Sequence, residues 1–483
     1  MDRKSAKQRL ARTAFRSSCA AVALISASGL ALPAYAQRSG MIVENIPHMR
    51  PGMIVENIPH APPVHMIAEN IPQVTAPVLI APTPFATPST AAAQGTPTFV
   101  SGSGTISQTA TLDTITVNTA EAIIDWALFD TGIGGGDITF LADSTTLFFD
   151  GLSGHTVLNR VIPTDQSRAI RFDGRVLSND NVWFYSPGGI VIGGTGSFDV
   201  GSLVLTTNDI DTSGGLFGPD GEIRFRGAAG STSSIIIEDR PNAADSIEAT
   251  NDGSYVALVA PRIEHYGRVD VNGSVAYVAA EQADRTINSG LFDITVTVGT
   301  TDPNGIVHGA DGRTEGEGRN PTDESVDDDG NIVPANPDAQ AIYLVAVPKN
   351  DAITMLVGGR VGYRPAVSAG VENGQIILSA GYNVSVDSFA PVPAVVLDGN
   401  PVNAVPASID LLAPEFDSNA IAQSSSAINA VNDGAGGVRT DGDLTLISGT
   451  RIDIGGRNGG SADIGGDLVL RAGSGSQGGT INI

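Results

Sequence analysis

The side chains that could do chemistry in this sequence are few and widely spaced. Beyond residue 99, imidazoles occur only at His155, His265 and His308, and no His-Glu-x-x-His pattern sets two of them on one helix face for a metal ion. A general base must lie within hydrogen-bonding reach of the proton that it removes. We therefore expect each histidine to be a solvated turn or strand residue, and we assign no catalytic residue, no metal site and no cofactor.

One short segment combines carboxylates with guanidinium groups, at Arg171, Asp173, Arg175 and Asp180. Enzymes that cleave polysaccharides use paired carboxylates as acid, base or nucleophile. Charged side chains at turns are also expected for solubility alone. An enzyme of this class requires three or more carboxylates and an arginine to converge on one face of the fold. We predict that the chain is not an enzyme, and a polysaccharide-degrading enzyme is the alternative.

A glycine-rich stretch, residues 181–207, could be a phosphate-binding loop or a purely structural repeat. A phosphate loop of the common type ends in Gly-Lys, because the lysine ammonium contacts the phosphates. The sequence contains no Gly-Lys pair, and its only lysines are Lys4, Lys7 and Lys349. The structural interpretation is therefore favoured. The side chains expected to pack inside the repeat are those of Trp183, Ile190, Ile192 and Val200.

The positions of the apolar runs in this stretch indicate how the chain is arranged. Runs begin at Val182, Ile190, Phe198 and Leu203, so three short strands use 21 residues before the fourth begins. Short runs of β-formers separated by Gly, Asn, Asp and Ser continue from residue 99 onward, without sustained helical periodicity. Strands this short suit one turn of a three-sided parallel coil in which each turn stacks on the last. A β-sandwich or a propeller is the alternative all-β arrangement.

The N-terminus predicts export. Residues 1–36 hold a basic start, an apolar run and Ala34-Tyr35-Ala36, which is the pattern of a cleaved signal peptide, with an uncleaved anchor as the alternative. The single cysteine, Cys19, lies in this segment, so the exported part has no disulfide. The formal net charge of −25 disfavours nucleic acid and anionic membranes as partners, and we expect no stable membrane insertion.

Residues 37–98 are predicted to be a disordered, proline-rich linker. Residues 40–48 recur unchanged at 52–60, and a looser copy follows at 65–73. Proline at this density opposes both helix and strand pairing. A duplicated spacer is favoured over a linear partner-binding motif and over a metal site at the histidines of the repeats.

Residues 301–338 are predicted to be an acidic loop inserted into the coil. Its centre, Asp323 to Asn331, lacks the ligand spacing of an EF-hand, so a solvated loop is favoured over a Ca²⁺ site. Residues 339–483 are expected to continue the coil. The last residues, Gly478 to Ile483, stop within a strand-like repeat, and we expect the chain to be a fragment of a longer protein.

Two motifs near the start of the β-rich region identify a family. Residues 124–132 read Ile-Asp-Trp-Ala-Leu-Phe-Asp-Thr-Gly and residues 157–161 read Val-Leu-Asn-Arg-Val. They resemble the Trp-x-x-Phe-x-x-Gly and Leu-Asn-Arg-Val elements of the filamentous haemagglutinin N-terminal domain, which is the secretion domain of two-partner-secretion exoproteins. The matching residues are Trp126, Phe129, Gly132, Asn159 and Arg160.

A third motif follows in the order and spacing of that family. Residues 172–190 contain Gly174, an aliphatic strand and then Ser-Pro-Gly-Gly-Ile, ending at Ile190, where the family has Asn-Pro-x-Gly-Ile. Residues 254–261 and 267–271 resemble the family's continuation. Both asparagines of the family's Asn-Pro-Asn-Gly are replaced, and we expect Ser186 to cap the turn and Gly188 to adopt the backbone angle of the second asparagine.

The resemblance implies a fold, a partner and a location. The fold would be an all-β, right-handed parallel β-helix with a capping secretion domain at residues 99–300. The partner would be an outer-membrane β-barrel transporter of a Gram-negative bacterium, with a host or neighbouring-cell surface as a further partner of an adhesin-like exoprotein. The protein would pass through the periplasm to the cell surface or the medium. The residues expected to be recognised by the transporter are Asn159, Arg160, Ser186, Pro187, Gly188 and Gly189.

Overall fold

The computed structural model describes residues 91–128, 135–241, 244–288, 291–317, 325–326, 332–333, 340–349, 352–364, 373–385, 388–391, 396–397, 400–401, 406–431, 437–454, 461–473 and 478–483. The predicted signal peptide and most of the predicted linker lie outside these residues. The secondary structure of the described residues consists of β-strands, and none of them forms a helix long and apolar enough to cross a membrane.

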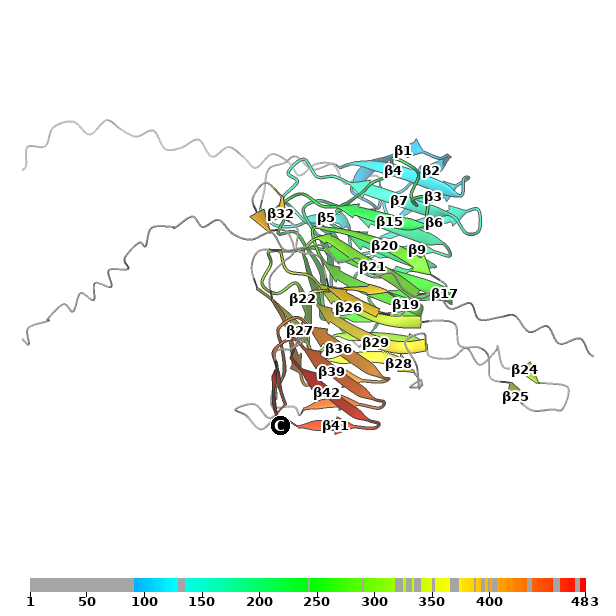
Figure 1. Cartoon of the computed structure of the whole chain (residues 1–483). Helices are drawn as coiled ribbons and strands as arrows, with labels where there is room; N and C mark the ends of the chain where they lie inside the picture. The colour runs from blue at the N-terminus through cyan, green and yellow to red at the C-terminus, as the bar shows by residue number, and fades with distance from the viewer. Residues whose placement is uncertain are drawn as a thin grey trace, which may run out of the picture. The chain divides into compact units, whose positions relative to one another are not determined.

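The glycine-rich stretch forms one complete turn of a parallel coil. Strands β10 (Asn181–Tyr185), β11 (Ile190–Ile192) and β12 (Ser197–Asp199) follow one another around the turn. The next strand, β13 (Ser202–Thr206), then lies parallel on β10, with Val182 opposite Leu203. The predicted 21-residue turn and the predicted parallel β-helix are both confirmed, because the same stacking recurs along the chain (Figure 1).

The stacked turns form three parallel ladders, which we name after the strands of this turn. The β11 ladder contains β5 (Ile138–Leu141), β8 (Ile170–Phe172), β11, β16 (Ser234–Ile237), β18 (Arg262–His265), β22 (Ile306–His308), β27 (Ile353–Val357), β34 (Ala407–Leu412), β37 (Ala427–Val431), β40 (Arg451–Asp453) and β43 (Thr480–Asn482). The β12 ladder contains β3 (Leu112–Val117), β6 (Thr146–Gly151), β9 (Arg175–Ser178), β12, β17 (Ile247–Ala260), β19 (Arg268–Ala279), β23 (Arg313–Glu317), β28 (Arg360–Arg364), β35 (Glu415–Phe416), β38 (Val438–Thr440) and β41 (Ala462–Ile464).

The third ladder, the β10 ladder, shares β17 and β19 with the second, because these two long strands run through the corner between them. It contains β4 (Glu121–Leu128), β7 (Thr156–Val161), β10, β13, β17, β19, β26 (Gln340–Ala346), β29 (Asn373–Ala380), β36 (Ala420–Ser424), β39 (Leu444–Ser448) and β42 (Leu468–Ala472).

Two short antiparallel strand pairs lie apart from these ladders in the strand pairing. They are β24 (Ser325–Val326) with β25 (Ile332–Val333), and β32 (Val396–Leu397) with β33 (Asn400–Pro401).

An antiparallel cap covers the first turn of the coil. Strand β1 (Gly95–Ser101) pairs with β4, and β2 (Gly104–Gln108) pairs with β3. The buried carboxylate of Asp113 accepts hydrogen bonds from the backbone N–H groups of Ala92 and Ala93, each at 3.0 Å. The cap therefore begins within the predicted linker, whose end at residue 98 was placed too late.

The interior of the coil is filled by inward-facing side chains from all three ladders. Ile190, Ile192 and Val200 lie there, as their spacing predicts. In the first turns the filling is aromatic: the ring centroids of Phe172 and Phe184 lie 5.0 Å apart, and further phenylalanines continue the stack. Such close edge-to-face contacts add to the stability that burial alone provides.

A second core lies outside the coil, beneath an antiparallel sheet that we call the outer sheet. Its strands, in order, are β14 (Asp209–Ile210), β15 (Glu222–Arg226), β20 (Gln282–Asn288), β21 (Leu291–Val298), β30 (Tyr382–Ser385) and β31 (Ser388–Pro391). The prediction that Trp183 faces inward is wrong: Val182 and Phe184 point into the coil, and Trp183 packs beneath the outer sheet. Both faces of β10 are buried, so its side chains do not alternate between polar and apolar. The sequence of the strand therefore could not show which side chains point into the coil.

The boundary predicted for the acidic insertion is also wrong at its start. Strands β22 and β23 fall inside residues 301–338, yet Ile306 pairs with Ile263 and Arg313 pairs with Arg268 in the regular stack. The coil therefore continues to Glu317. The acidic centre of the predicted loop, apart from β24, lies outside the described residues.

The expectation that the histidines are solvated is wrong, because His155, His265 and His308 are all fully buried. The rings of His265 and His308 lie 4.8 Å apart inside the coil. His308 Nδ1 donates to the Gly358 carbonyl at 2.6 Å, so its Nε2 accepts, and Thr314 Oγ1 lies 3.1 Å from it. Burial lowers the pKa of His308 to about 4 and holds that of His265 well below its ordinary value.

These buried imidazoles predict a stability that falls in mild acid. In the unfolded chain, the His308 imidazole takes up a proton at a pKa of about 6.5, whereas in the folded chain it does so at a pKa of about 4. The contribution of His308 to stability is therefore complete above pH 6.5 and is lost as the pH falls from 6.5 to 4. We expect His308 alone to remove about 3 kcal/mol over this range. Denaturant midpoints between pH 7.5 and 4.5 measure the loss.

The variant His308→Gln is the control, since its amide can still donate to Gly358 and contact Thr314. It does not titrate, so its stability should vary less with pH between 7.5 and 5 than that of the unchanged chain. Equal slopes in the two proteins would assign the acid sensitivity to other groups.

Candidate functional site

Asn159 joins the first three turns of the β10 ladder from the inside of the structure. It lies on β7, is fully buried and accepts a hydrogen bond from Trp126 Nε1 on β4 at 3.0 Å. Its Nδ2 donates to the carbonyl of Trp183 on β10 at 3.2 Å. The two sequence motifs that contain Trp126 and Asn159 are thus joined by a hydrogen bond in the folded chain. Their separation in sequence did not reveal this contact.

Arg160 points the other way and is partly exposed. Its guanidinium lies 3.8 Å from the Asp125 carboxylate and 3.9 Å from that of Asp209. Exposed ion pairs at such distances contribute little to stability. Of the two residues in the Leu-Asn-Arg-Val motif, Arg160 is therefore the one that a partner can contact once the chain is folded.

The Ser-Pro-Gly-Gly turn connects β10 to β11, and its expected geometry needs correction. The hydroxyl of Ser186 has no hydrogen-bond partner among the described residues, so Ser186 does not cap the turn through its side chain. The positive φ, 129°, belongs to Gly189 and not to Gly188. Gly188 is required for another reason: a Cβ there would lie 2.1 Å from the carbonyl oxygen of Arg168 in the preceding turn.

The surface beside this turn is concave and uncharged. A groove of about 390 Å³ is lined by Pro187, Gly188, Gln166, Ser167 and residues 228–233. Of the remaining motif residues, Ile190 lies in the coil interior, and Gly174 packs so closely on the preceding turn that a Cβ would lie 2.5 Å from the Ala142 carbonyl oxygen. Phe129 and Gly132 lie outside the described residues.

Carboxylates do converge on the outer face of the β12 ladder. They line a groove of about 600 Å³, whose charged residues are Asp143, Asp173, Arg175, Asp199, Arg240, Asp245 and Glu248. Asp199 and Glu248 are direct neighbours on successive turns. Partial burial raises the pKa of Glu248, and the negative charges of Asp199, Asp245 and Asp270 raise it further. Two members of the segment that the sequence singled out, Asp173 and Arg175, therefore belong to this groove.

The other two members of that segment, Arg171 and Asp180, do not line the groove. Arg171 binds Glu238 through both terminal nitrogens, at 2.7 and 2.6 Å, and these hydrogen bonds raise the pKa of the guanidinium. Asp180 lies at another corner, where its carboxylate is 3.2 Å from His155 Nδ1. Arg171 Nε also donates to the Asp173 carboxylate at 2.9 Å, so Arg171 stays beside the groove and Asp180 lies apart from it.

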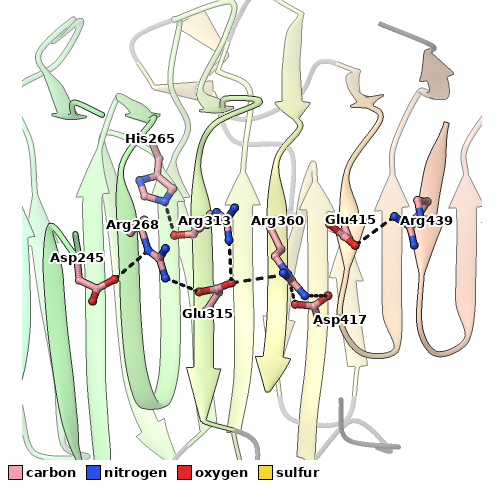
Figure 2. Close-up of polar contacts among 9 residues, drawn as sticks. All are labelled: Asp245, His265, Arg268, Arg313, Glu315, Arg360, Glu415, Asp417 and Arg439. Atoms are coloured by element: carbon pink, nitrogen blue, oxygen red, sulfur yellow. Dashed lines mark hydrogen bonds and ion pairs between the residues drawn. The ribbon is translucent and has the colours of Figure 1, made fainter. Parts of the chain in front are cut away.

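Beyond the groove, the same face carries a row of charges that we call the charge ladder. Arg268, Arg313 and Arg360 occupy equivalent positions on successive turns. Glu315, whose side chain is 2% exposed, lies between them, with Oε2 3.2 Å from Arg268 Nη2 and Oε1 3.6 Å from Arg360 Nε (Figure 2).

The charge ladder ends in carboxylates on both sides. Asp245 accepts from Arg268 Nε at 3.0 Å, and Asp417 accepts from Arg360 Nη2 at 3.1 Å. The hydrogen bond to Asp417 raises the pKa of Arg360. In the sequence, the charge ladder corresponds to an Arg-x-acid repeat, as in Arg268-Val-Asp and Arg313-Thr-Glu. This spacing places both charges on one face of a strand. The ladder fixes charges across successive turns and holds those turns in register.

Comparisons with known proteins concern the fold. No protein-family model matches the chain, and no curated protein matches it. Among solved structures, the HMW1 secretion domain from Haemophilus influenzae is similar, with 13% identity and a TM-score of 0.33 over 78% of this chain and 83% of that chain. The filamentous hemagglutinin secretion domain is similar with 12% identity and a TM-score of 0.34 over 80% of this chain and 99% of that chain. The parallel β-helix itself rests on the strand pairing described above.

Proposed function

We propose that this chain is an exported exoprotein of the two-partner-secretion type. Its N-terminal coils direct it through a partner outer-membrane β-barrel transporter. The observation that supports this most directly is the arrangement of the three sequence motifs. Trp126, Asn159 and the strand leading into the Ser186 turn lie on successive turns at the start of the coil, and Asn159 bonds to both neighbours.

The architecture suits a chain that emerges end first. In the three parallel ladders of the described residues, each turn pairs with the turns before and after it, so folding can begin at the first turns outside the membrane and continue as more chain arrives. The sequence holds no cysteine after Cys19, so no disulfide would obstruct passage of the unfolded chain. Arg160 and the groove beside Pro187 are the surfaces that we assign to transporter contact in any folded intermediate.

Secretion from a Gram-negative host that lacks such transporters tests this function. With a co-produced two-partner transporter, we expect the full chain in the culture medium or on the cell surface. Without the transporter, we expect it in the periplasm, because the signal peptide supports only the first crossing. Immunoblots of the fractions measure the distribution.

The matched control is the same chain without residues 1–36, which should remain in the cytoplasm in both strains. Equal amounts outside the cell with and without the transporter would overturn the proposal.

The finer part of the proposal is an adhesin-like role for the exported coil, toward a host or a neighbouring cell. The charge ladder and the acidic groove supply an extended charged surface for such contacts. Purified chain should bind cells in a salt-dependent manner, since contacts of this kind are screened by ions. Failure to bind any cell surface tested would remove the adhesin role and leave the export proposal intact.

A second candidate function is a polysaccharide-degrading enzyme, and the acidic groove is the observation that favours it. Five carboxylates and two arginines line the groove, and Glu248 has a raised pKa beside ionisable neighbours, as an acid catalyst requires. Reducing-sugar release from acidic and neutral polysaccharides tests it, with Glu248→Gln expected to abolish any activity. No cleavage of the substrates, or cleavage that survives in Glu248→Gln, would exclude this groove as its site.

A further inference from the structure

The outer sheet is an amphipathic layer with one charged side chain on its apolar face. Its outward side carries ion pairs such as Arg226 with Asp284. Across the inward side, one row of paired residues runs through four strands: Ile223, Arg285, Ile294 and Val384. Three of the four are aliphatic, so Arg285 occupies a position that the pattern of the sheet reserves for an apolar residue.

The guanidinium of Arg285 is buried without a hydrogen-bonding partner. The residue is 1% exposed, and its Nε, Nη1 and Nη2 atoms contact no acceptor among the described residues. Its neighbours are aromatic: the guanidinium carbon lies 3.8 Å from the ring centroid of Phe292 and 4.7 Å from that of Tyr255. Burial lowers the pKa of Arg285 to about 10, so the group is still charged at neutral pH.

The two tyrosine hydroxyls that act on the charge of Arg285 already take part in other hydrogen bonds. Tyr255 Oη accepts from Trp183 Nε1 at 3.1 Å, and Tyr343 Oη accepts from the Phe292 N–H at 3.3 Å. The surface of the guanidinium nitrogens is closed even to water, since each nitrogen is inaccessible. Contact with two aromatic faces returns part of the lost hydration energy but satisfies none of the five N–H donors. The closed arrangement therefore holds a charge that would be more stable in water.

The outer sheet is fastened to the coil at its base. Glu281, just before β20, is fully buried and binds Lys349 Nζ of the coil at 2.7 Å. The Gly227 N–H, just after β15, donates to the Glu281 carbonyl at 2.8 Å. The base of the outer sheet is fixed to the coil, whereas the unsatisfied charge of Arg285 lies further along the sheet. This arrangement favours a motion in which the sheet swings away from the coil about its base and exposes Arg285 to solvent.

We propose that the outer sheet is a hinged cover that opens from the coil as a unit, and that Arg285 sets the balance between its closed and open states. Closing buries the apolar faces of both layers, and opening rehydrates the guanidinium. The open state uncovers a strip of the β10 ladder that includes Trp183, Tyr255 and Tyr343, while the interior of the coil stays packed. This inference concerns the folded chain and does not depend on the secretion proposal.

Hydrogen–deuterium exchange of the full chain at neutral pH tests the cover. In the unchanged protein, amides of β15, β20 and β21 should exchange faster than those of β11, β18 and β27 in the β11 ladder. In Arg285→Met, which keeps the length of the side chain without its charge, exchange in the outer sheet should slow by about tenfold or more. Exchange in the β11 ladder should stay unchanged.

The control variant is Arg226→Met, which removes an arginine from the outward side of the same sheet. It should not slow exchange, because the Arg226 side chain is 35% exposed and its guanidinium is paired with Asp284. Faster or unchanged exchange of the outer sheet in Arg285→Met would overturn the proposal. Equal exchange of the outer sheet and the β11 ladder in the unchanged protein would also overturn it, without any variant.

Discussion

Replacing Lys349 by methionine is expected to lower the free energy of unfolding by about 3–5 kcal/mol, because it leaves a buried carboxylate without its cation. The Glu281 side chain is 1% exposed, and Lys349 Nζ lies 2.7 Å from its Oε2. Glu281 Oε1 has no hydrogen-bond partner among the described residues, so no other group would compensate the charge. Denaturant unfolding, followed by circular dichroism, measures the loss.

The double variant Lys349→Met with Glu281→Leu is the matched control. Replacing both partners of a buried pair by apolar groups of similar size is often neutral, so the double variant should recover most of the stability lost by the single one. If the double variant were as unstable as Lys349→Met alone, the loss would reflect packing rather than an unpaired carboxylate. The same pair anchors the outer sheet, so Lys349→Met should also speed exchange in β20.

The coil was predictable because its signal is local and repeated. The spacing of Val182, Ile190, Phe198 and Leu203 defines one turn, and Val182 does pair with Leu203. Parallel pairing at this spacing leaves few alternatives, since each short strand must bury its inward residues against those of the next turn. Glycines that allow close approach between turns, such as Gly188, are consistent with the same geometry.

The outer sheet was not predictable from the same pattern, because its strands come from three separate segments of the chain, around residues 209–226, 282–298 and 382–391. Each segment looks like one more β-run of a coil. The outward burial of Trp183 and Tyr343 depends on this sheet, so their environment could not be derived from the alternation of their own strands. The same is true of Arg285, whose sequence context gives no sign of burial.

The candidate site was predicted in part. Asp173 and Arg175 do line the acidic groove, but Asp199, Asp245 and Glu248 come from later turns, and only the register of the coil brings them there. The buried pair of His265 and His308 has the same origin, since the two strands that carry them are neighbours in the stack. Residues a full turn apart in sequence can be recognised as neighbours only when the length of each turn is known. That length varies along this chain.

Replacing Asn159 by leucine is expected to lower the free energy of unfolding by about 2–4 kcal/mol. The change keeps the approximate size of the side chain but removes the acceptor for Trp126 Nε1 and the donor to the Trp183 carbonyl. Trp126 is 3% exposed and Asn159 is fully buried, so water cannot replace either bond. Denaturant unfolding of the full chain measures the effect, and a loss below about 1 kcal/mol would contradict it.

A second substitution separates the structural role of Asn159 from recognition by the transporter. Trp126→Phe removes the indole N–H. In the double variant with Asn159→Leu, no indole N–H is left without an acceptor. The double-mutant cycle should therefore give a favourable coupling of about 1–3 kcal/mol between Trp126 and Asn159 in the unchanged chain. If Asn159 serves secretion only by stabilising the first turns, export of each variant should follow its stability, and the double variant should be exported better than its summed losses predict. If the transporter reads the asparagine itself in the unfolded chain, export should stay low in both variants that lack it, whatever their stability. Quantified secretion of the three variants beside their unfolding free energies therefore decides whether the Leu-Asn-Arg-Val motif is a packing element or a signal.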